Sequence, residues 1–195
     1  MLPYTKLDII FDVAELANAL ESTDLFGEFP QRGLPGSPHE SMTDIWVRYK
    51  DPTDAVRTGD WSAFTEEHES EWLKDLPGVK DMCAKLMDLL GGTRLGGVLI
   101  TKLPPGHVIH PHTDDGWHAS YYDKYFVAIK NEPGAKFCFE AGSIDPKPGE
   151  VHAFRNDVTH WVVNNSKVDR IAMIICIKQN SLSKEGLCLG QQQQQ

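Results

Sequence analysis

The chain has 195 residues, of which 41% are hydrophobic and 24% charged, as in an ordinary globular domain. Such a chain can bury a core without a disulfide or metal cross-link, and its composition excludes a wholly disordered, collagen-like or coiled-coil protein. The net charge of −9 makes nucleic acid an unlikely partner, because an acidic surface repels phosphate groups.

The sequence contains no recognisable membrane span, secretory signal or paired-cysteine motif. No apolar run reaches the roughly 18 residues of a membrane helix, and the first residues lack the basic and apolar pattern of a secretory signal. No two cysteines form a C-x-x-C pair, and the four are Cys83, Cys138, Cys176 and Cys188. We therefore expect free thiols, a cytoplasmic location and no membrane partner.

The first 92 residues indicate short helices, loops and one strand. Apolar residues spaced as on one helix face predict helices over 12–20, 65–76 and 77–90. Residues 27–41 contain three Gly and three Pro and predict a loop. The β-branched and aromatic residues of 44–49 predict a strand.

After Gly92 the chain changes to short segments rich in β-branched and aromatic residues, separated by turns containing Pro, Gly and Asn. The predicted strands cover 97–103, 107–110, 124–130, 136–140, 150–154, 160–163 and 170–178. Short strands at this spacing are typical of a sandwich or jelly roll. We therefore predict a mainly β protein with flanking α, in one domain over 1–190. It combines a cupin-like double-stranded β-helix (93–180) with a helical N-terminal layer (1–92), followed by a disordered tail at Gln191–Gln195.

Four of the eight histidines lie within residues 107–118, in the segment PPGHVIHPHTDDGWH. Residues two apart on a strand point to the same face, so the segment offers two alternative sets of metal ligands. The first set is His112, Asp114 and His160, the last from a later strand. Two histidines and one carboxylate bind Fe(II) and leave three positions open for a cosubstrate and O₂. Arg170 follows ten residues after His160, and its planar guanidinium is suited to the far carboxylate of a 2-oxo acid.

The second set is His110, His112 and His152, which is the arrangement of a cupin metal site, although no glutamate follows the second histidine as it does in cupins. This set would belong to a cupin-type metalloenzyme that works without 2-oxoglutarate. A β-sandwich that only binds a partner is a third alternative. The aromatic residues after the histidine segment are expected in a loop over the site, and they are Trp117, His118, Tyr121 and Tyr122.

Residues 98–178 resemble the Fe(II)/2-oxoglutarate-dependent oxygenases, most closely the aspartyl/asparaginyl β-hydroxylase family. The matching segments are ITKLPPGHVIHPHTD (100–114), NEPGAKFCF (131–139), PGEVHAFRN (148–156) and HWVVNNSKVDRIAMII (160–175). The resemblance implies that His112 and His160 bind iron. It also implies that Arg170 and Thr101 hold the distal carboxylate of 2-oxoglutarate, and that Lys124 faces the same cosubstrate.

The sequence departs from this family in one place. The family proper has Gly two residues after the first histidine, whereas this chain has Asp114, which restores the full triad of most 2-oxoglutarate oxygenases. The resemblance implies a hydroxylase that oxidises a substrate C–H bond and converts 2-oxoglutarate to succinate and CO₂. The sequence leaves the substrate open between a small molecule and a peptidyl group, and it leaves the oligomeric state open.

Overall fold

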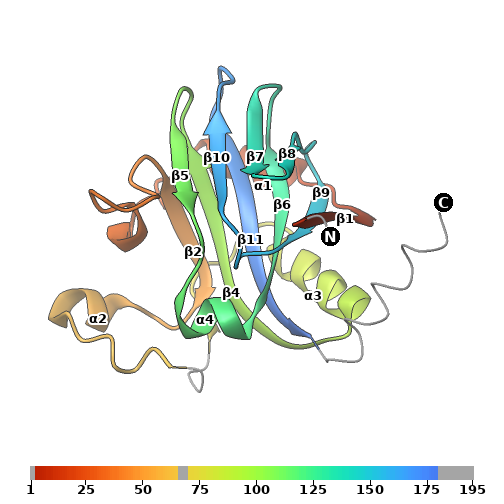
Figure 1. The fold of residues 1–195 in the computed structure, drawn as a ribbon. Helices are drawn as coiled ribbons and strands as arrows, with labels where there is room; N and C mark the ends of the chain where they lie inside the picture. The colour runs from red at the N-terminus through yellow and green to blue at the C-terminus, as the bar shows by residue number, and fades with distance from the viewer. Residues whose placement is uncertain (1–2, 66–69, 180–195) are drawn as a thin grey trace.

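Two antiparallel β-sheets face each other in the computed structural model, which describes residues 3–65 and 70–179 (Figure 1). The larger sheet has the strand order β1-β9-β6-β11-β4-β2-β3 and the smaller sheet has the order β5-β10-β7-β8. The larger sheet contains β1 (Tyr4–Ile10), β2 (Thr43–Tyr49), β3 (Glu71–Trp72), β4 (Gly92–Leu103), β6 (Asp123–Lys130), β9 (Glu150–Phe154) and β11 (Arg170–Gln179). The smaller sheet contains β5 (Val108–His112), β7 (Ala135–Phe139), β8 (Gly142–Ile144) and β10 (His160–Asn164). The helices are α1 (Ala14–Glu21), α2 (Thr53–Thr58), α3 (Val79–Leu90) and α4 (Gly116–Tyr121), with a 3₁₀ turn at Pro30–Gly33. The prediction of a mainly β protein is confirmed.

The side chains of strand β11 point alternately into two hydrophobic cores, one on each face of the larger sheet. Ile171, Met173, Ile175 and Ile177 point to one face, where they join the apolar side chains of α1 and α3. Ile174 points to the other face and packs against the core between the two sheets. This period of two is what a strand imposes, and it sends Arg170 to the same face as Ile174.

The core between the sheets is rich in aromatic side chains. Phe126 of β6 is fully buried there and meets Phe137 of β7 edge to face, with 5.2 Å between ring centroids. Burying one such side chain stabilises the fold by roughly 1.5–3 kcal/mol. The two sheets are therefore held at a fixed separation next to the space that contains the histidines.

The helical N-terminal layer is not confirmed. Helices α1 and α3 form where 12–20 and 77–90 predict them, but β1, β2 and β3 from the same segment extend the larger sheet. The helix expected over 65–76 is wrong at its described residues, since Glu71 and Trp72 form β3 and pair with β2. Trp72 and Leu76 still reach the core from extended chain, so tertiary pairing outweighs the local periodicity.

Three of the four cysteines, Cys83, Cys138 and Cys176, are free and buried. Cys188 and the tail at Gln191–Gln195 lie outside the described residues. No helix in the described part of the chain is both long and apolar enough to cross a membrane.

Candidate metal centre

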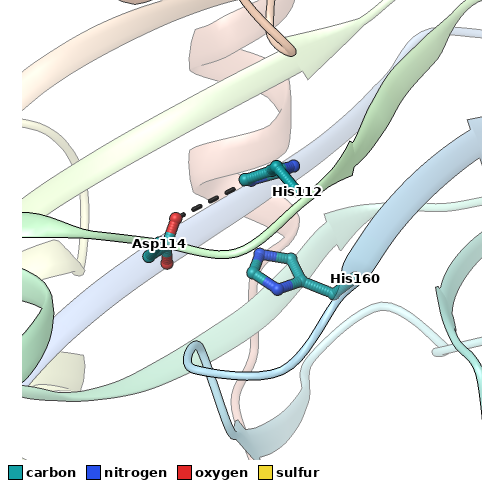
Figure 2. Close-up of side chains that lie close together, drawn as sticks. All are labelled: His112, Asp114 and His160. Carbon is teal, nitrogen blue, oxygen red and sulfur yellow. Dashed lines mark ion pairs between the residues drawn. The ribbon is translucent and has the colours of Figure 1, made fainter.

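His112, Asp114 and His160 converge between the two sheets (Figure 2), and their nearest ligand atoms all lie within 4.8 Å of one another. His112 ends β5 and pairs directly with His160, which begins β10. Asp114 follows in the loop after β5, where its backbone N–H donates to the Asn156 carbonyl at 2.8 Å. Within residues 3–65 and 70–179, this is the one group of three or more such side chains close enough to share an ion.

Both histidines present the nitrogen that a metal needs. The Nδ1 atom of His112 lies 2.7 Å from the His110 carbonyl, and that of His160 lies 2.9 Å from the Val158 carbonyl. A carbonyl only accepts, so each Nδ1 carries the proton and each Nε2 keeps its lone pair. Burial lowers the pKa of His160, which keeps its imidazole neutral at neutral pH.

Asp114 is held ionised by its surroundings. Burial alone would raise the pKa of this carboxyl, but the charge and hydrogen bond of the Lys124 ammonium, with smaller contributions from His160 and His112, together lower it below its ordinary value. Lys124 Nζ donates to Asp114 Oδ2 at 2.5 Å, and Asp114 Oδ1 lies 3.7 Å from His112 Nε2. The three-residue set therefore offers two imidazole nitrogens and one carboxylate.

The expectation that His110 shares a face with His112 is wrong. Ile109 pairs with Val162 while His112 pairs with His160, so His110 and Pro111 together oppose Trp161. This β-bulge reverses the alternation, and proline is tolerated there because an edge strand needs no donor at that point. His110 points outward, half-exposed and 4.0 Å from Glu40.

His152 does not reach the three-residue set either. Its ring stacks on Phe126 with an interplanar angle of 8° and a centroid distance of 5.0 Å, and its Nε2 lies 3.4 Å from Glu150. The histidines of the cupin alternative are thus not brought together around His112.

A cavity of about 60 Å³ extends from the three ligands between the sheets, and Thr101, Lys124 and Arg170 line it. Arg170 is only 4% exposed and its Nε has no hydrogen-bond partner. In the described part of the chain no carboxylate pairs with this guanidinium, although burial lowers its pKa only to about 10, so it remains charged. An unpaired buried cation is costly, and this one is therefore suited to an anionic ligand.

A second, larger cavity of about 440 Å³ shares His112, Asp114 and Lys124 with the first. Its remaining wall comes mainly from residues to which the sequence assigned no role, and these include Arg32, His39, Tyr49 and Cys176. Arg32 Nη1 donates to the buried Asp44 at 2.8 Å, and the other oxygen of Asp44 accepts from Trp46 Nε1 at 3.1 Å. Asp44 therefore orients both an arginine and a tryptophan beside the cavity.

His39 contacts the site directly, although the sequence assigned it no role. Its ring lies edge-on to His112 at 4.5 Å between centroids, and it lines both cavities. Burial, reinforced by Arg32 and His112, lowers the pKa of His39 to about 3, so it is neutral. No local pattern identifies it, because it sits in the Gly- and Pro-rich segment that only the tertiary fold brings to the site.

The aromatic segment after Asp114 is a helix, not the predicted loop. Asp115 precedes α4, which runs from Gly116 to Tyr121. Of the four aromatic residues that the sequence placed over the site, His118 lines the larger cavity. Asn156 fixes the helix by donating to the Ala119 carbonyl at 2.9 Å.

The residues present fit an iron ion and a 2-oxo acid. Two imidazole nitrogens and one carboxylate match the donor set that non-haem Fe(II) takes. The buried Arg170, which also lines the small cavity, has the charge that a second carboxylate would need.

Comparison with protein families gives an independent assignment. A family model described as aspartyl/asparaginyl beta-hydroxylase matches residues 39–180, nearly three quarters of the chain. The match spans all three proposed ligands together with Thr101, Lys124 and Arg170. No curated protein matches the sequence.

Solved structures agree on the fold. A 2OG-Fe(II) oxygenase family oxidoreductase from Burkholderia pseudomallei is 14% identical, with a TM-score of 0.57 over 91% of this chain and 85% of that one. The viral collagen prolyl hydroxylase of Paramecium bursaria Chlorella virus-1, solved with 2OG, is 13% identical, with a TM-score of 0.51 over 92% and 97%. A Trichoplax adhaerens prolyl hydroxylase, solved with a hypoxia inducible factor peptide fragment, is 10% identical, with a TM-score of 0.57 over 91% and 84%. The chain therefore has the jelly-roll fold of these oxygenases.

Proposed function

Because this chain belongs to the aspartyl/asparaginyl β-hydroxylase family, we propose that it is an Fe(II)- and 2-oxoglutarate-dependent dioxygenase that hydroxylates a C–H bond. One observation carries the proposal: a His–Asp–His set shares a small cavity with a buried arginine that has no carboxylate partner in the described part of the chain. Fe(II), 2-oxoglutarate and O₂ together supply an oxidant for the substrate, with release of succinate and CO₂.

The residues divide into two groups. His112 and His160 offer Nε2 to the metal and Asp114 offers a carboxylate oxygen. Arg170 pairs with the distal carboxylate of 2-oxoglutarate. Thr101 lines the same cavity as Arg170, and the Thr101 hydroxyl donates to the Ala172 carbonyl at 3.2 Å. A charge-assisted pair of this kind is stronger than a neutral hydrogen bond, so Arg170 fixes the orientation of the cosubstrate.

The walls of the small cavity keep water away from the reacting groups. Apolar and aromatic side chains from both sheets surround it, and they are Ile109, Phe126, Phe137, Phe154, Val162 and Ile174. Excluding water strengthens the ion pair at Arg170 and limits side reactions of a strong oxidant.

The substrate enters through the larger cavity, whose volume of about 440 Å³ is in the range of small-molecule sites. It accommodates either a small metabolite or one side chain of a peptide. The free, buried cysteines support a reducing compartment, and we place the protein in the cytoplasm.

The test is an anaerobic titration of 2-oxoglutarate into Fe(II)-loaded protein, followed by visible absorbance. We expect a charge-transfer band that saturates at one equivalent. Arg170→Gln should weaken the binding of 2-oxoglutarate without removing the metal, whereas His110→Ala should leave both unchanged. Fe(II) binding without any such band would contradict the proposal.

A further inference from the structure

The two oxygens of Asp114 face different partners. Oδ2 accepts a hydrogen bond from Lys124 Nζ at 2.5 Å, while Oδ1 lies 3.7 Å from His112 Nε2. The side chains of Lys124 and Asp114 are only 16% and 17% exposed, so solvent screens this ion pair weakly. The carboxylate is thus held with one oxygen toward the ligand histidine and the other toward the ammonium group.

The backbone of the lysine is held by strand pairing on both sides. Lys124 lies in β6, where it pairs with Phe154 of β9 on one side and Cys176 of β11 on the other. Asp114 lies in the loop beyond β5 and before α4. A residue fixed by two neighbouring strands therefore sets the orientation of a residue in a connecting loop.

We propose that Lys124 is a positioning residue that occupies Oδ2 of Asp114 and so makes this carboxylate a metal ligand through Oδ1 alone. The inference rests on the proposed metal centre and deepens it. A facial set of two histidines and one carboxylate leaves three of six positions open, two for a chelating 2-oxo acid and one for O₂. A carboxylate bound through both oxygens would fill one of these positions.

This role replaces the one that the family resemblance implies for Lys124. Its positive charge is already balanced by the Asp114 carboxylate, whereas Arg170 in the same cavity has no carboxylate partner in the described part of the chain and has an Nε without a hydrogen bond. The distal carboxylate of a 2-oxo acid therefore has its cation in Arg170, and Lys124 acts on the cosubstrate only through Asp114.

The experiment compares Lys124→Met, which removes the charge and keeps the unbranched stem, with Lys124→Arg, which keeps the charge. Binding of Co(II) is measured by competition with a chromophoric chelator, without turnover. Losing the hydrogen-bonding partner of a metal ligand typically costs about 10–100-fold in affinity, and we expect this loss in Lys124→Met, with recovery in Lys124→Arg. Crystal structures of the Mn(II)-loaded wild type and Lys124→Met should show one Asp114 oxygen on the metal in the wild type, and both oxygens or a displaced carboxylate in the variant.

Two results would overturn the inference. One is an Asp114 bound through both oxygens in the wild type. The other is a Lys124→Met protein that binds Co(II) like the wild type but loses 2-oxoglutarate, which would return Lys124 to the cosubstrate. If His160→Ala binds Co(II) as tightly as the wild type, the metal centre itself is rejected. This failure is therefore distinguishable from a failure of the inference about Lys124.

Discussion

The two sheets contribute different chemistry to the site. The larger sheet presents Thr101 from β4, Lys124 from β6 and Arg170 from β11, three adjacent strands whose side chains line one cavity. The smaller sheet presents His112 and His160 from an edge strand and its neighbour, and a β-bulge sets the direction of His112. The hydroxyl and the two cations therefore come from strands paired on both sides, whereas the direction of His112 depends on one β-bulge beside an edge.

The largest effect is expected on the smaller sheet. His160→Ala removes one of two nitrogen ligands, so metal affinity should fall by more than the roughly 100-fold that accompanies loss of a ligand's hydrogen-bonding partner. Isothermal titration of Co(II) measures this. His152→Ala is the matched control, because this histidine stacks on Phe126 outside the set. An equal loss in both variants would place the metal elsewhere.

On the larger sheet, removing Arg170 should separate stability from binding. Arg170→Met eliminates a buried, unpaired cation, so the protein without ligands should unfold at the same or a higher temperature than the wild type. The same variant should bind 2-oxoglutarate about 10–100-fold more weakly, because an ion pair of this kind contributes about 1.5–3 kcal/mol. Thermal unfolding of the metal-free protein measures the first effect, and thermal unfolding with Zn(II), with and without 2-oxoglutarate, measures the second. A strongly destabilised metal-free variant would show that Arg170 is structural.

A third comparison concerns the wall of the larger cavity. Asp44→Asn weakens the ion pair to Arg32 and alters the contact with Trp46 Nε1. Because Asp44 is buried, we expect a loss of about 1.5–3 kcal/mol in the free energy of unfolding. Urea denaturation measures this loss, and Co(II) affinity should stay unchanged. A drop in metal affinity would mean that this wall also supports the ligands.

The smallest effect is expected at the edge of the larger sheet, where Lys6 lies 2.6 Å from Glu150. Burial raises the pKa of Glu150, but hydrogen bonds from Lys6 and the Lys147 backbone outweigh burial, and the pKa falls to about 2. A carboxyl with a depressed pKa stabilises the fold fully above its ordinary pKa of 4.5, and this stabilisation is lost as the pH falls toward 2. Lys6→Met should therefore cost about 0.5 kcal/mol at pH 7 and less at pH 2.5. Urea denaturation at both pH values checks this, and a cost that does not change with pH would contradict it.

The sequence was informative about the strands themselves. Arg170 begins the strand that the apolar run after it predicts, and Thr101 lies opposite Ala172 of that strand in its neighbour. Spacing and residue type gave His112, Asp114 and His160 as one of two alternative ligand sets, and this is the set that the structure brings together.

The sequence could not supply what depends on long-range pairing. The bulge at His110 and Pro111 appears only when β5 is set against β10, and it reverses the direction of His110. Arg32 and His39 reach the site because a loop of low local signal packs over it. The contact between Lys124 and Asp114 joins a strand to a distant loop, and no spacing rule anticipates it.

The most direct test of the account is a crystal structure of the protein with Mn(II) and 2-oxoglutarate under anaerobic conditions. We predict one metal ion bound by His112 Nε2, His160 Nε2 and Asp114 Oδ1, with the cosubstrate chelating the metal and its distal carboxylate on Arg170. A metal bound at His110 or His152, or 2-oxoglutarate bound away from Arg170, would contradict the account.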